Sequence, residues 1–474
     1  MNIRHKPLKT KVNTAVIGIL ASSVVHAGGF SLYTEGTGYA TGNFAAGIAA
    51  EAYDASTGWY NPAGLALIRD QQAVFGGVGV FPTAKLSGTS TFTQVSPVLG
   101  TLNYIQTFAD LNGAENAFVP SFHYARPLGE NATFGFSVTS PFGLSTDWGP
   151  DSPVRYQGSF TELITTNISP ELGAKVTDNL ALGAGLDLQY ARVKFNRILG
   201  LPTVFNVLGN PYGSDSLTYN KGDSWSVGFH AGIMAMFNDN HTRLGLNYQS
   251  EMRHKFRGYS QLTGPLAGST SVFGVISDGV FRSDDLYSSA IDLPDVVTLS
   301  AYHDLNEKVA LLASVVYNGW SSFKNIELFN IAAPSIRADG AISRVYASNS
   351  SPQNYKDTVR VALGANYHVN EKIMLRVGGG YDPTPTNDID RDVRLPDTDR
   401  WALSIGGHYQ ATDALGFELG YTHLFPASHP VINRTDALAP GVTYNVSAVG
   451  KAGASLVGIQ ATWTMDKEKP VSTK

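Results

Sequence analysis

The sequence is constrained above all by a repeated alternation of apolar and other residues between residues 72 and 464. In the stretch 225–237 every odd-numbered residue is apolar, and an aromatic residue, Trp225 or Phe237, stands at each end. Because neighbouring side chains of a β-strand point to opposite faces, this pattern predicts strands with one apolar face. At about 3.3 Å per residue and a tilt near 40°, the two aromatic residues would stand roughly 30 Å apart along a membrane normal, at two aromatic girdles.

Fourteen such segments follow one another, and the connections between them alternate in length. Six connections are tight polar turns, for example 238–240, and seven are long, for example 258–289 and 324–354. Short turns at one end and long loops at the other are typical of an outer-membrane barrel, whereas a soluble β-sandwich would not sort its loops in this way. We therefore expect an all-β chain: a transmembrane antiparallel β-barrel of about 14 strands over residues 70–465. The predicted strands lie near 72–86, 116–127, 131–143, 158–176, 179–197, 222–237, 241–257, 290–304, 307–323, 355–369, 371–382, 398–411, 413–427 and 452–464.

The composition agrees with such a barrel and excludes several other classes. Charged residues make up 15% of the 474 residues and hydrophobic residues 43%, with a mean hydropathy of −0.07. Low charge without an excess of apolar residues is unlike an acidic cytosolic enzyme or a helical membrane protein. The net charge of −5 gives no reason to expect nucleic acid as a partner. The lack of cysteine excludes disulfides, thiolate metal sites and cysteine nucleophiles.

The two ends of the chain differ from the alternating part. Residues 1–27 combine a basic start, a short apolar run over 12–25 and the cleavage pattern Val25-His26-Ala27, which predicts a secretory signal peptide. A transmembrane anchor is the alternative, but the run is shorter than the ~20 residues that a spanning helix needs. At the other end, Trp463 closes the last predicted strand, and residues 466–474 are expected to form a polar tail.

Residues 28–69 lack the alternation and are rich in Gly and Ala. They also contain several large apolar residues, among them Phe30, Trp59 and Leu65, which is too apolar for a disordered tail. A compact segment that precedes a barrel can satisfy its backbone polar groups inside the lumen. We therefore expect an N-terminal hatch, or plug.

Several motifs occur in a fixed order along the mature chain, and together they resemble those of a known family. They are Gly29-Phe30-Ser31-Leu32, Asn61-Pro62-Ala63-Gly64-Leu65, Val119-Pro120-Ser121-Phe122-His123-Tyr124, Ser140-Pro141-Phe142-Gly143-Leu144-Ser145-Thr146, Lys356-Asp357-Thr358-Val359-Arg360-Val361-Ala362-Leu363-Gly364 and Leu395-Pro396-Asp397-Thr398-Asp399-Arg400. The set is similar to that of the long-chain fatty acid transporter (FadL) family, which includes the TodX-like aromatic-hydrocarbon transporters.

The resemblance implies a monomeric barrel in the outer membrane of a Gram-negative bacterium, surrounded by outer-membrane lipid and lipopolysaccharide. It implies passive transport of a hydrophobic small molecule, with long-chain fatty acids favoured: capture by extracellular loops, binding in the lumen, and rearrangement of the hatch around Asn61, Pro62 and Ala63. Uptake of aromatic or aliphatic hydrocarbons is the alternative within the family. An outer-membrane barrel enzyme is less favoured because no Ser/His spacing suggests one, and a general porin is disfavoured by the hatch.

The segment Ser140-Pro141-Phe142-Gly143 is expected to interrupt the third strand. Proline cannot donate to a sheet ladder, and glycine weakens a strand, so pairing should break here. The resemblance implies that these four residues form an inward kink, through which the ligand leaves sideways. An ordinary β-bulge near the end of the strand is the alternative.

Binding a fatty acid needs an apolar channel for the chain and a cation for the carboxylate. Arg197 and Lys356 stand at the ends of predicted strands, at positions where the resemblance implies carboxylate partners. It also implies that Phe30 lies against the ligand. The alternative for both cations is that they are solvated strand-end residues.

Other candidate chemistry is sparse. Asp388, Asp390 and Asp392 form an acidic run, but the glycine and glutamate of a calcium-binding loop are absent, and a solvated loop is our interpretation. Metalloprotease, hydrolase and phosphate-binding motifs are missing. We therefore expect no catalytic residue, no metal and no cofactor.

Overall fold

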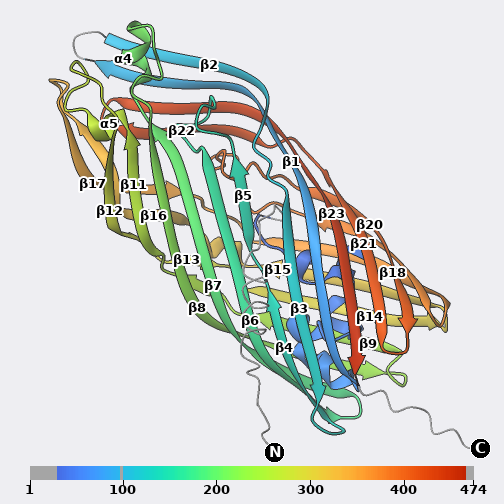
Figure 1. The fold of residues 1–474 in the computed structure, drawn as a ribbon. Helices are drawn as coiled ribbons and strands as arrows, with labels where there is room; N and C mark the ends of the chain where they lie inside the picture. Colours follow the sequence, from blue (N-terminus) through green and yellow to red (C-terminus); the bar gives the residue numbers. More distant parts are fainter. Residues whose placement is uncertain (1–28, 97–99, 466–474) are drawn as a thin grey trace, which may run out of the picture.

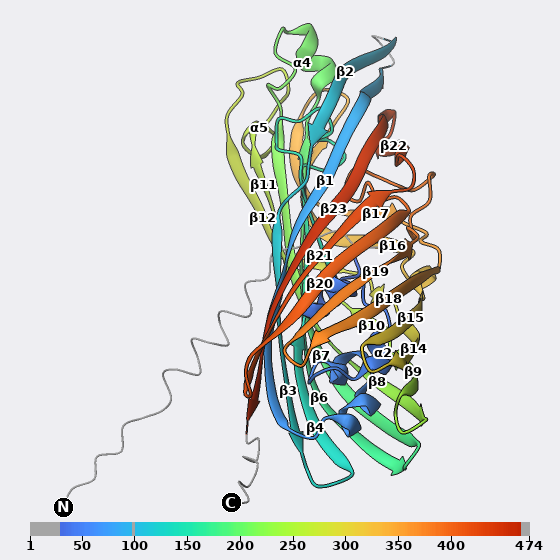
Figure 2. The ribbon, with the colours of Figure 1, turned by 90° about the vertical axis from the view of Figure 1, so that its right-hand side faces the viewer.

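The computed structural model describes residues 29–96 and 100–465 of the chain. The expected signal peptide, residues 1–27, and the expected polar tail, residues 466–474, lie outside the described residues. Within them the chain forms a long, closed antiparallel β-barrel (Figures 1 and 2). The barrel closes where Gln71 of its first strand pairs with Met465 of its last. The predicted fold class is therefore confirmed.

Fourteen strands of the described chain form the barrel wall, and each corresponds to one predicted segment. They are β1 (Gln71–Ser96), β3 (Ala117–Pro127), β4 (Ala132–Thr139), β6 (Phe160–Thr177), β7 (Leu180–Leu199), β8 (Ser216–Phe237), β9 (Thr242–Gln249), β14 (Val296–Asn306), β15 (Val309–Asn318), β18 (Thr358–Asn370), β19 (Ile373–Asp382), β20 (Arg400–Thr412), β21 (Leu415–Pro426) and β23 (Val442–Met465).

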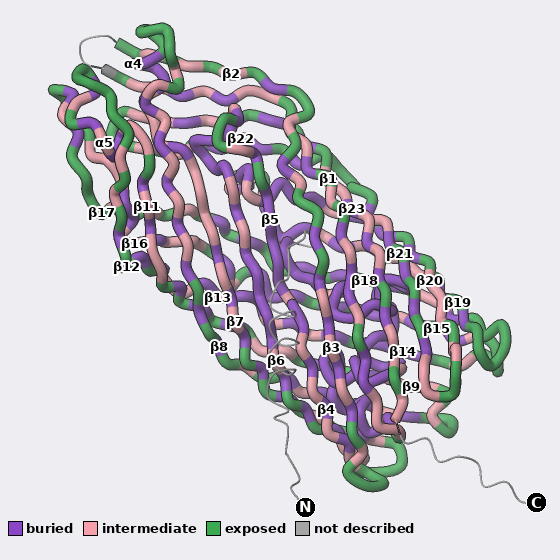
Figure 3. Tube along the Cα trace, in the orientation of Figure 1, coloured by how far each residue is buried: buried purple, intermediate pink, exposed green. Residues whose placement is uncertain are grey.

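The alternation of the sequence becomes an alternation of exposure along the wall (Figure 3). In β8, Trp225 and Val227 are 57% and 73% exposed, whereas Ser226 between them is 8% exposed. Phe237 at the other end of the strand is 45% exposed. Odd-numbered residues of β8 thus point outward, where an apolar side chain faces lipid in a membrane barrel.

The long connections contain structure of their own, which the sequence pattern did not predict. The stretches 87–115, 258–289, 324–354 and 428–451, expected as loops, carry strands that prolong the wall as hairpins at the upper end of Figure 1. The hairpin strands are β2 (Gly100–Asn112), β11 (Arg257–Gly264), β12 (Gly279–Ser288), β16 (Asn325–Ile336), β17 (Ile342–Pro352) and β22 (Val431–Ala439). In addition, β5 (Gly143–Asp147) continues the third wall strand after an interruption, and β10 (Met252–His254) pairs with β13 (Ile291–Leu293) in a separate two-stranded sheet. Three short helices, α4 (Pro202–Val207), α5 (Pro265–Gly268) and η4 (Trp320–Ser322), lie in the connections between the wall strands. Because the long connections of such barrels are extracellular, this end is the outer one.

The N-terminal segment lies inside the barrel and is built from very short helices, drawn in blue in Figures 1 and 2. They are η1 (Thr34–Gly36), η2 (Gly38–Gly42), α2 (Ile48–Glu51), α3 (Thr57–Tyr60) and η3 (Pro62–Leu67), and nearly all of their residues are buried. Among the described residues, no helix has the length and apolarity needed to cross a membrane.

Glycines in the wall let the hatch approach the strands closely. A Cβ atom on Gly232 would overlap Asn61, one on Gly245 would overlap the carbonyl of Ala49, and one on Gly183 would overlap Pro62. Larger residues at these three inward positions would therefore push the hatch away from the wall.

Candidate ligand-binding site and wall gap

The third wall strand is interrupted at the predicted place. β4 ends at Thr139 and β5 begins at Gly143, and both strands pair with β6. Thr139 pairs with Asn167 and Gly143 with Ile164, so toward β6 the interruption resembles a bulge with one extra residue. The residues between the two strands, 140–142, belong to no strand.

On the side of β3 the interruption is much larger. Pairing between β3 and β4 ends at Phe122 and Val138, and residues 117–121 of β3 have no partner strand on this side in the described chain. Pro120 lies in this unpaired stretch, so each edge of the interruption carries a proline, Pro120 or Pro141. Since neither residue can donate to a ladder, the sequence itself keeps this part of the wall open. The open stretch between residues 117–121 and 140–143 is called the wall gap below.

The N-terminal residues pair with the inner side of the kink. Ser31 and Phe142 form an antiparallel β-bridge. Leu32 N–H donates to the carbonyl of Pro141, and Gly143 N–H donates to the carbonyl of Phe30, both at 2.8 Å. These bonds satisfy backbone groups that the broken ladder would leave unpaired. The first described residues of the hatch are therefore part of the structure of the kink.

Phe30 lines a small apolar cavity of about 40 Å³. Its ring centroid lies 4.6 Å from that of Trp320, 5.4 Å from that of Phe323 and 6.3 Å from that of Tyr355. Phe195 of β7 also contributes to the lining. A cavity of this volume holds a few water-sized molecules, since about 10–15 Å³ of such space accommodates one water. Phe30 therefore closes part of an apolar site, which would widen if this ring moved.

Two arginines lie at the outer end of this cavity. Arg394 is part of its lining, and Arg197 is the next inward residue of β7 after Phe195. Burial, together with the positive charge of Arg394, lowers the pKa of Arg197 to about 10. No hydrogen bond or ion pair joins the Arg197 side chain to the described residues. An anion between the two arginines would relieve their repulsion.

The structure places the two predicted cations, Arg197 and Lys356, in different surroundings. Arg197 lies above the cavity, whereas Lys356 is exposed and outside the lining; its backbone N–H donates to the carbonyl of Pro385 at 3.0 Å. The role predicted for Lys356 stays a prediction. Arg394 was not singled out in the sequence because it lies in a long connection without periodicity, although it directly precedes the quoted motif that begins at Leu395.

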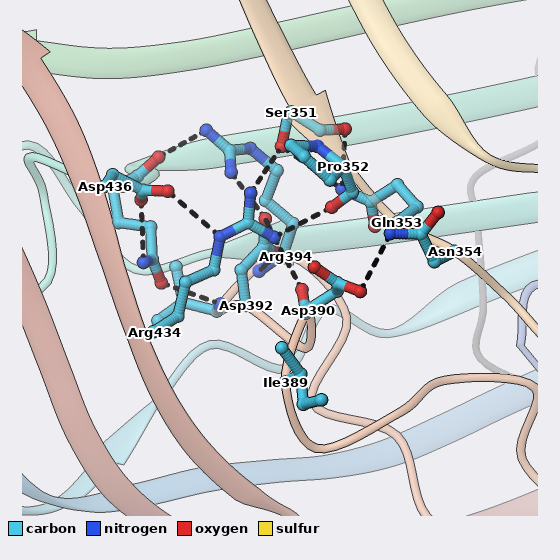
Figure 4. A network of polar contacts seen from close by, with 12 residues as sticks. Ser351, Pro352, Gln353, Asn354, Ile389, Asp390, Asp392, Arg394, Arg434 and Asp436 are labelled. Atoms are coloured by element: carbon cyan, nitrogen blue, oxygen red, sulfur yellow. Dashed lines mark hydrogen bonds and ion pairs between the residues drawn. The ribbon is translucent and has the colours of Figure 1, made fainter.

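A network of polar contacts lies above the cavity and fixes Arg394 (Figure 4). Asp392 Oδ2 accepts a bond from Arg394 Nη1 at 2.8 Å and lies 3.6 Å from Arg434 Nη1. Arg434 Nε donates to Asp436 Oδ1 at 2.9 Å. Asp392 is only 3% exposed, so the interpretation of the acidic run as a solvated loop is wrong for this residue. Within the described chain, no group of three ligating side chains could hold a metal ion.

The hatch is held to the wall by buried polar contacts. Asn61 Nδ2 donates to the carbonyls of Ala49, at 2.7 Å, and of Ile233 in β8, at 3.1 Å, and its Oδ1 accepts from Ala63 N–H at 3.1 Å. Pro62, between them, packs against the wall at Gly183. The motif of Asn61, Pro62 and Ala63 therefore joins two parts of the hatch to two wall strands, β7 and β8.

Two inward arginines of the wall also bind the hatch. Arg376 Nη1 lies 2.8 Å from Glu51 Oε1 of α2. Arg360 Nη2 donates to Thr34 Oγ1 at 2.7 Å and to the carbonyl of Phe44 at 3.0 Å. Separating a buried charged group from its partners leaves the charge uncompensated and costs several kcal/mol. Both sets of contacts therefore resist release of the whole hatch.

The comparisons with known proteins agree with this architecture. The chain is 27% identical over 431 residues to the "Long-chain fatty acid transport protein" of Salmonella typhi, covering 89% of this chain and 92% of that protein. Its fold matches that of a FadL homologue from Pseudomonas aeruginosa with a TM-score of 0.74 at 23% identity, covering 92% of this chain and 100% of the other. It also matches the toluene transporter TbuX of Ralstonia pickettii with a TM-score of 0.60 at 18% identity, covering 92% and 98%.

The strongest of these findings is the match to a whole family. Residues 18–465, nearly the entire chain, match the family described as outer membrane protein transport protein (OMPP1/FadL/TodX). Together with the closed barrel, the internal hatch and the interrupted third strand, this match shows that the chain is a Gram-negative outer-membrane protein and belongs to the OMPP1/FadL/TodX family of transport proteins.

Proposed function

We propose that this protein carries long-chain fatty acids across the outer membrane by binding them in the cavity around Phe30 and releasing them sideways through the wall gap. One observation carries the proposal: the same residues close the cavity and pair with the kink. The Phe30 ring lines the cavity, while its carbonyl and the N–H of Leu32 bond to the kink. Moving this segment would open the binding site and the gap together.

The favoured ligand follows from the charge at the outer end of the cavity. An apolar chain in the lining would place its carboxylate near Arg197 and Arg394. Arg197 has no partner within the described chain, so a carboxylate would supply the charged hydrogen bonds that this guanidinium lacks. In this proposal Arg197 is the main carboxylate partner, and Arg394 is held in place by Asp392. Lys356 could meet the carboxylate only outside the cavity lining.

The proposed path is passive and lies within one monomer. The ligand is captured by the extracellular hairpins and enters the cavity as Phe30 moves. Adjustment around Asn61, Pro62 and Ala63 then accompanies the release of residues 30–32 from the kink. The ligand leaves between β3 and Ser140–Gly143, into the outer leaflet. The buried pairs of Arg360 and Arg376 favour a local change over expulsion of the hatch.

Transport of an aromatic hydrocarbon is a second candidate, and the ring cluster favours it. Phe30, Trp320, Phe323 and Tyr355 lie with neighbouring centroids 4.6–6.3 Å apart, which suits contact with a further ring. A neutral ligand of this kind would not need Arg197.

Binding measurements on lipid-free protein distinguish the two candidates. We expect palmitate to bind more tightly than its methyl ester, which has the same chain without the charge, and more tightly than toluene. Mass spectrometry of ligand that co-purifies with the protein gives an independent reading. Toluene binding that exceeds palmitate binding would favour the hydrocarbon, and no binding of either would contradict both proposals.

A further inference from the structure

The outward face of the barrel carries a cluster of cations just above the aromatic girdle. In β7 even-numbered residues point outward, and in β8 odd-numbered ones do. Tyr190 and Trp225, whose ring centroids are 5.2 Å apart, mark the girdle on these strands. The next outward positions toward the extracellular end are charged. We call this cluster the basic patch: Arg192, Lys194, Lys221, Lys255, Arg257 and Arg282.

Strand pairing brings the members of the basic patch together. Arg192 of β7 and Arg257 of β11 both pair with Asp223 of β8, one from each side. Lys194 pairs directly with Lys221. Like charges that face each other across two strands destabilise a sheet, and in this pair only Lys194 has a carboxylate beside it, that of Glu162.

Half of the basic patch makes no ion pair or side-chain hydrogen bond in the described chain, although Arg257 stands opposite Asp223 on the neighbouring strand. Glu162 Oε1 lies 3.1 Å from Arg192 Nη2 and 3.0 Å from Lys194 Nζ, and Arg282 Nε lies 2.6 Å from Asp284 Oδ1. By contrast, no ion pair or side-chain hydrogen bond joins the remaining three cations to any described residue. These three are Lys221, Lys255 and Arg257.

Aromatic rings hold the upper part of the basic patch in place. The Arg282 guanidinium lies 4.0 Å from the centroid of the Tyr259 ring, which stacks on Tyr219 with centroids 5.7 Å apart. Lys194 Nζ lies 5.6 Å from the centroid of Phe160. Such contacts fix cationic groups before any ligand arrives.

An apolar wall begins directly below the basic patch. Leu186, Trp225 and Val227 are 64%, 57% and 73% exposed on the outward face. Successive outward residues are about 7 Å apart along a strand, so cations and apolar side chains meet over the length of one lipid headgroup. The surface therefore matches a lipid with acyl chains below and anionic groups above, at the level of the outer leaflet.

We propose that the basic patch is a binding site for the phosphate groups of lipopolysaccharide in the outer leaflet. Lys221, Lys255 and Arg257 contact phosphate, and the acyl chains of lipid A lie along the outward side chains of β7 and β8. Charge complementarity carries this choice of partner, because the basic patch gathers unpaired cations on a chain whose net charge is −5. The site is independent of the transported ligand.

Binding of lipid A to lipid-free protein in detergent tests the proposal. The variant Lys221→Gln/Lys255→Gln/Arg257→Gln should bind bisphosphorylated lipid A roughly a hundredfold more weakly than the wild type. The control Lys175→Gln/Lys308→Gln/Lys372→Gln loses the same charge at the other end of the barrel and should bind like the wild type. Native mass spectrometry gives the bound fraction, and a heat-dependent shift on gels shows that each barrel is folded.

Two further lipids complete the test. Lipid A without its phosphates should bind the wild type as weakly as bisphosphorylated lipid A binds the basic-patch variant. Phosphatidylglycerol should bind the wild type less tightly than bisphosphorylated lipid A does. Undiminished binding by the basic-patch variant, or by phosphate-free lipid A, would overturn the proposal. Equal binding of phosphatidylglycerol would show that the basic patch accepts any anionic lipid, which overturns the assignment to lipopolysaccharide.

Discussion

At the scale of single residues, the candidate site depends on an arginine that makes no hydrogen bond or ion pair with the described residues, although the charge of Asp436 attracts it. Arg197 points inward above an apolar cavity, and the nearby charge of Arg394 acts against it. A buried cation without a carboxylate in contact lowers the stability of the empty protein. The same cation strengthens the binding of an anionic ligand. The sequence could point to Arg197 through its strand and the family resemblance. It could not point to Arg394, whose position depends on contacts with Asp392 and Gln157.

Replacing Arg197 separates the roles of the two predicted cations. Arg197→Gln should weaken palmitate binding by about 1.5–3 kcal/mol, the value of one hydrogen bond to a charged group, and should leave binding of the methyl ester unchanged. Lys356→Gln is the matched control and should change neither, because Lys356 is exposed. Equilibrium binding measures both. A selective loss of palmitate binding in Lys356→Gln alone would instead support the role predicted for Lys356 from the family resemblance.

We expect the stability of the hatch to depend on pH because of Glu35. Burial raises the pKa of this hatch carboxyl to about 7, although Arg360 acts in the opposite direction, and neither carboxyl oxygen has a hydrogen-bond partner in the described chain. A raised acid pKa means that folding disfavours the charged form. Stability is therefore greatest below the unfolded pKa of about 4.5 and falls as pH rises to about 7, by about 3 kcal/mol in all.

The variant Glu35→Gln should make the hatch more stable at pH 8 and should reduce this dependence to the part due to Asp54, another buried hatch carboxyl whose pKa burial raises to about 6. Hydrogen exchange of hatch amides, measured at pH 5 and pH 8 and corrected for intrinsic rates, reports the stability of the hatch. A wild-type hatch that is equally protected at both pH values would contradict the expected direction.

At the scale of elements, the sequence predicted the strands whose two faces lie in different surroundings, lipid outside and the lumen inside. A strand with lipid on one side must alternate, so all fourteen wall strands were visible in the sequence. The extracellular hairpins, such as β11 with β12, bury small polar as well as apolar residues on their inner face, for example Ser260 and Leu262, and their sequences carry no comparable pattern. The short helices of the hatch were not predictable for another reason, since close fits such as that of Asn61 beside Gly232 determine their conformation.

Proline on both edges keeps the wall gap open, so replacing these prolines should close it. Replacing Ser140, Pro141, Phe142 and Gly143 by Thr, Val, Thr and Val, together with Pro120→Val, should extend the β3–β4 ladder across the gap. The variant should resist heat at least as well as the wild type, because its strands gain backbone pairing. Uptake of palmitate by cells should fall close to that of a deletion strain, while binding at the extracellular side survives. Normal uptake by this sealed barrel would mean that the ligand passes through the hatch into the periplasm.

At the scale of the whole molecule, hatch and wall act as one closed unit. The barrel alone would leave an open lumen, and the hatch alone could not bury its backbone groups. Two of their contacts matter for the proposed path: the glycine positions that receive residues 49–63, and the bridge between Ser31 and Phe142. The first place is held by buried polar side chains, and the second by backbone bonds and by the contact of the Phe30 and Phe142 rings. Transport should therefore need release at the second place, with no more than a local adjustment around Asn61, Pro62 and Ala63 at the first.

A reversible cross-link at the bridge tests this expectation directly. Ser31 and Phe142 are a non-hydrogen-bonded pair flanked by two backbone bonds, an arrangement in which Cα atoms lie about 4.5 Å apart, within the range of a disulfide. The natural chain has no cysteine, so Ser31→Cys/Phe142→Cys introduces a single defined disulfide. Oxidised protein should bind little palmitate and support little uptake, and a reductant should restore both to the level of the reduced variant. The single variants Ser31→Cys and Phe142→Cys, which cannot form the bond, should not respond to oxidant. If the oxidised double variant transports as well as its reduced form, the N-terminal segment stays on the kink during transport, and both the cavity and the wall gap must open by another movement.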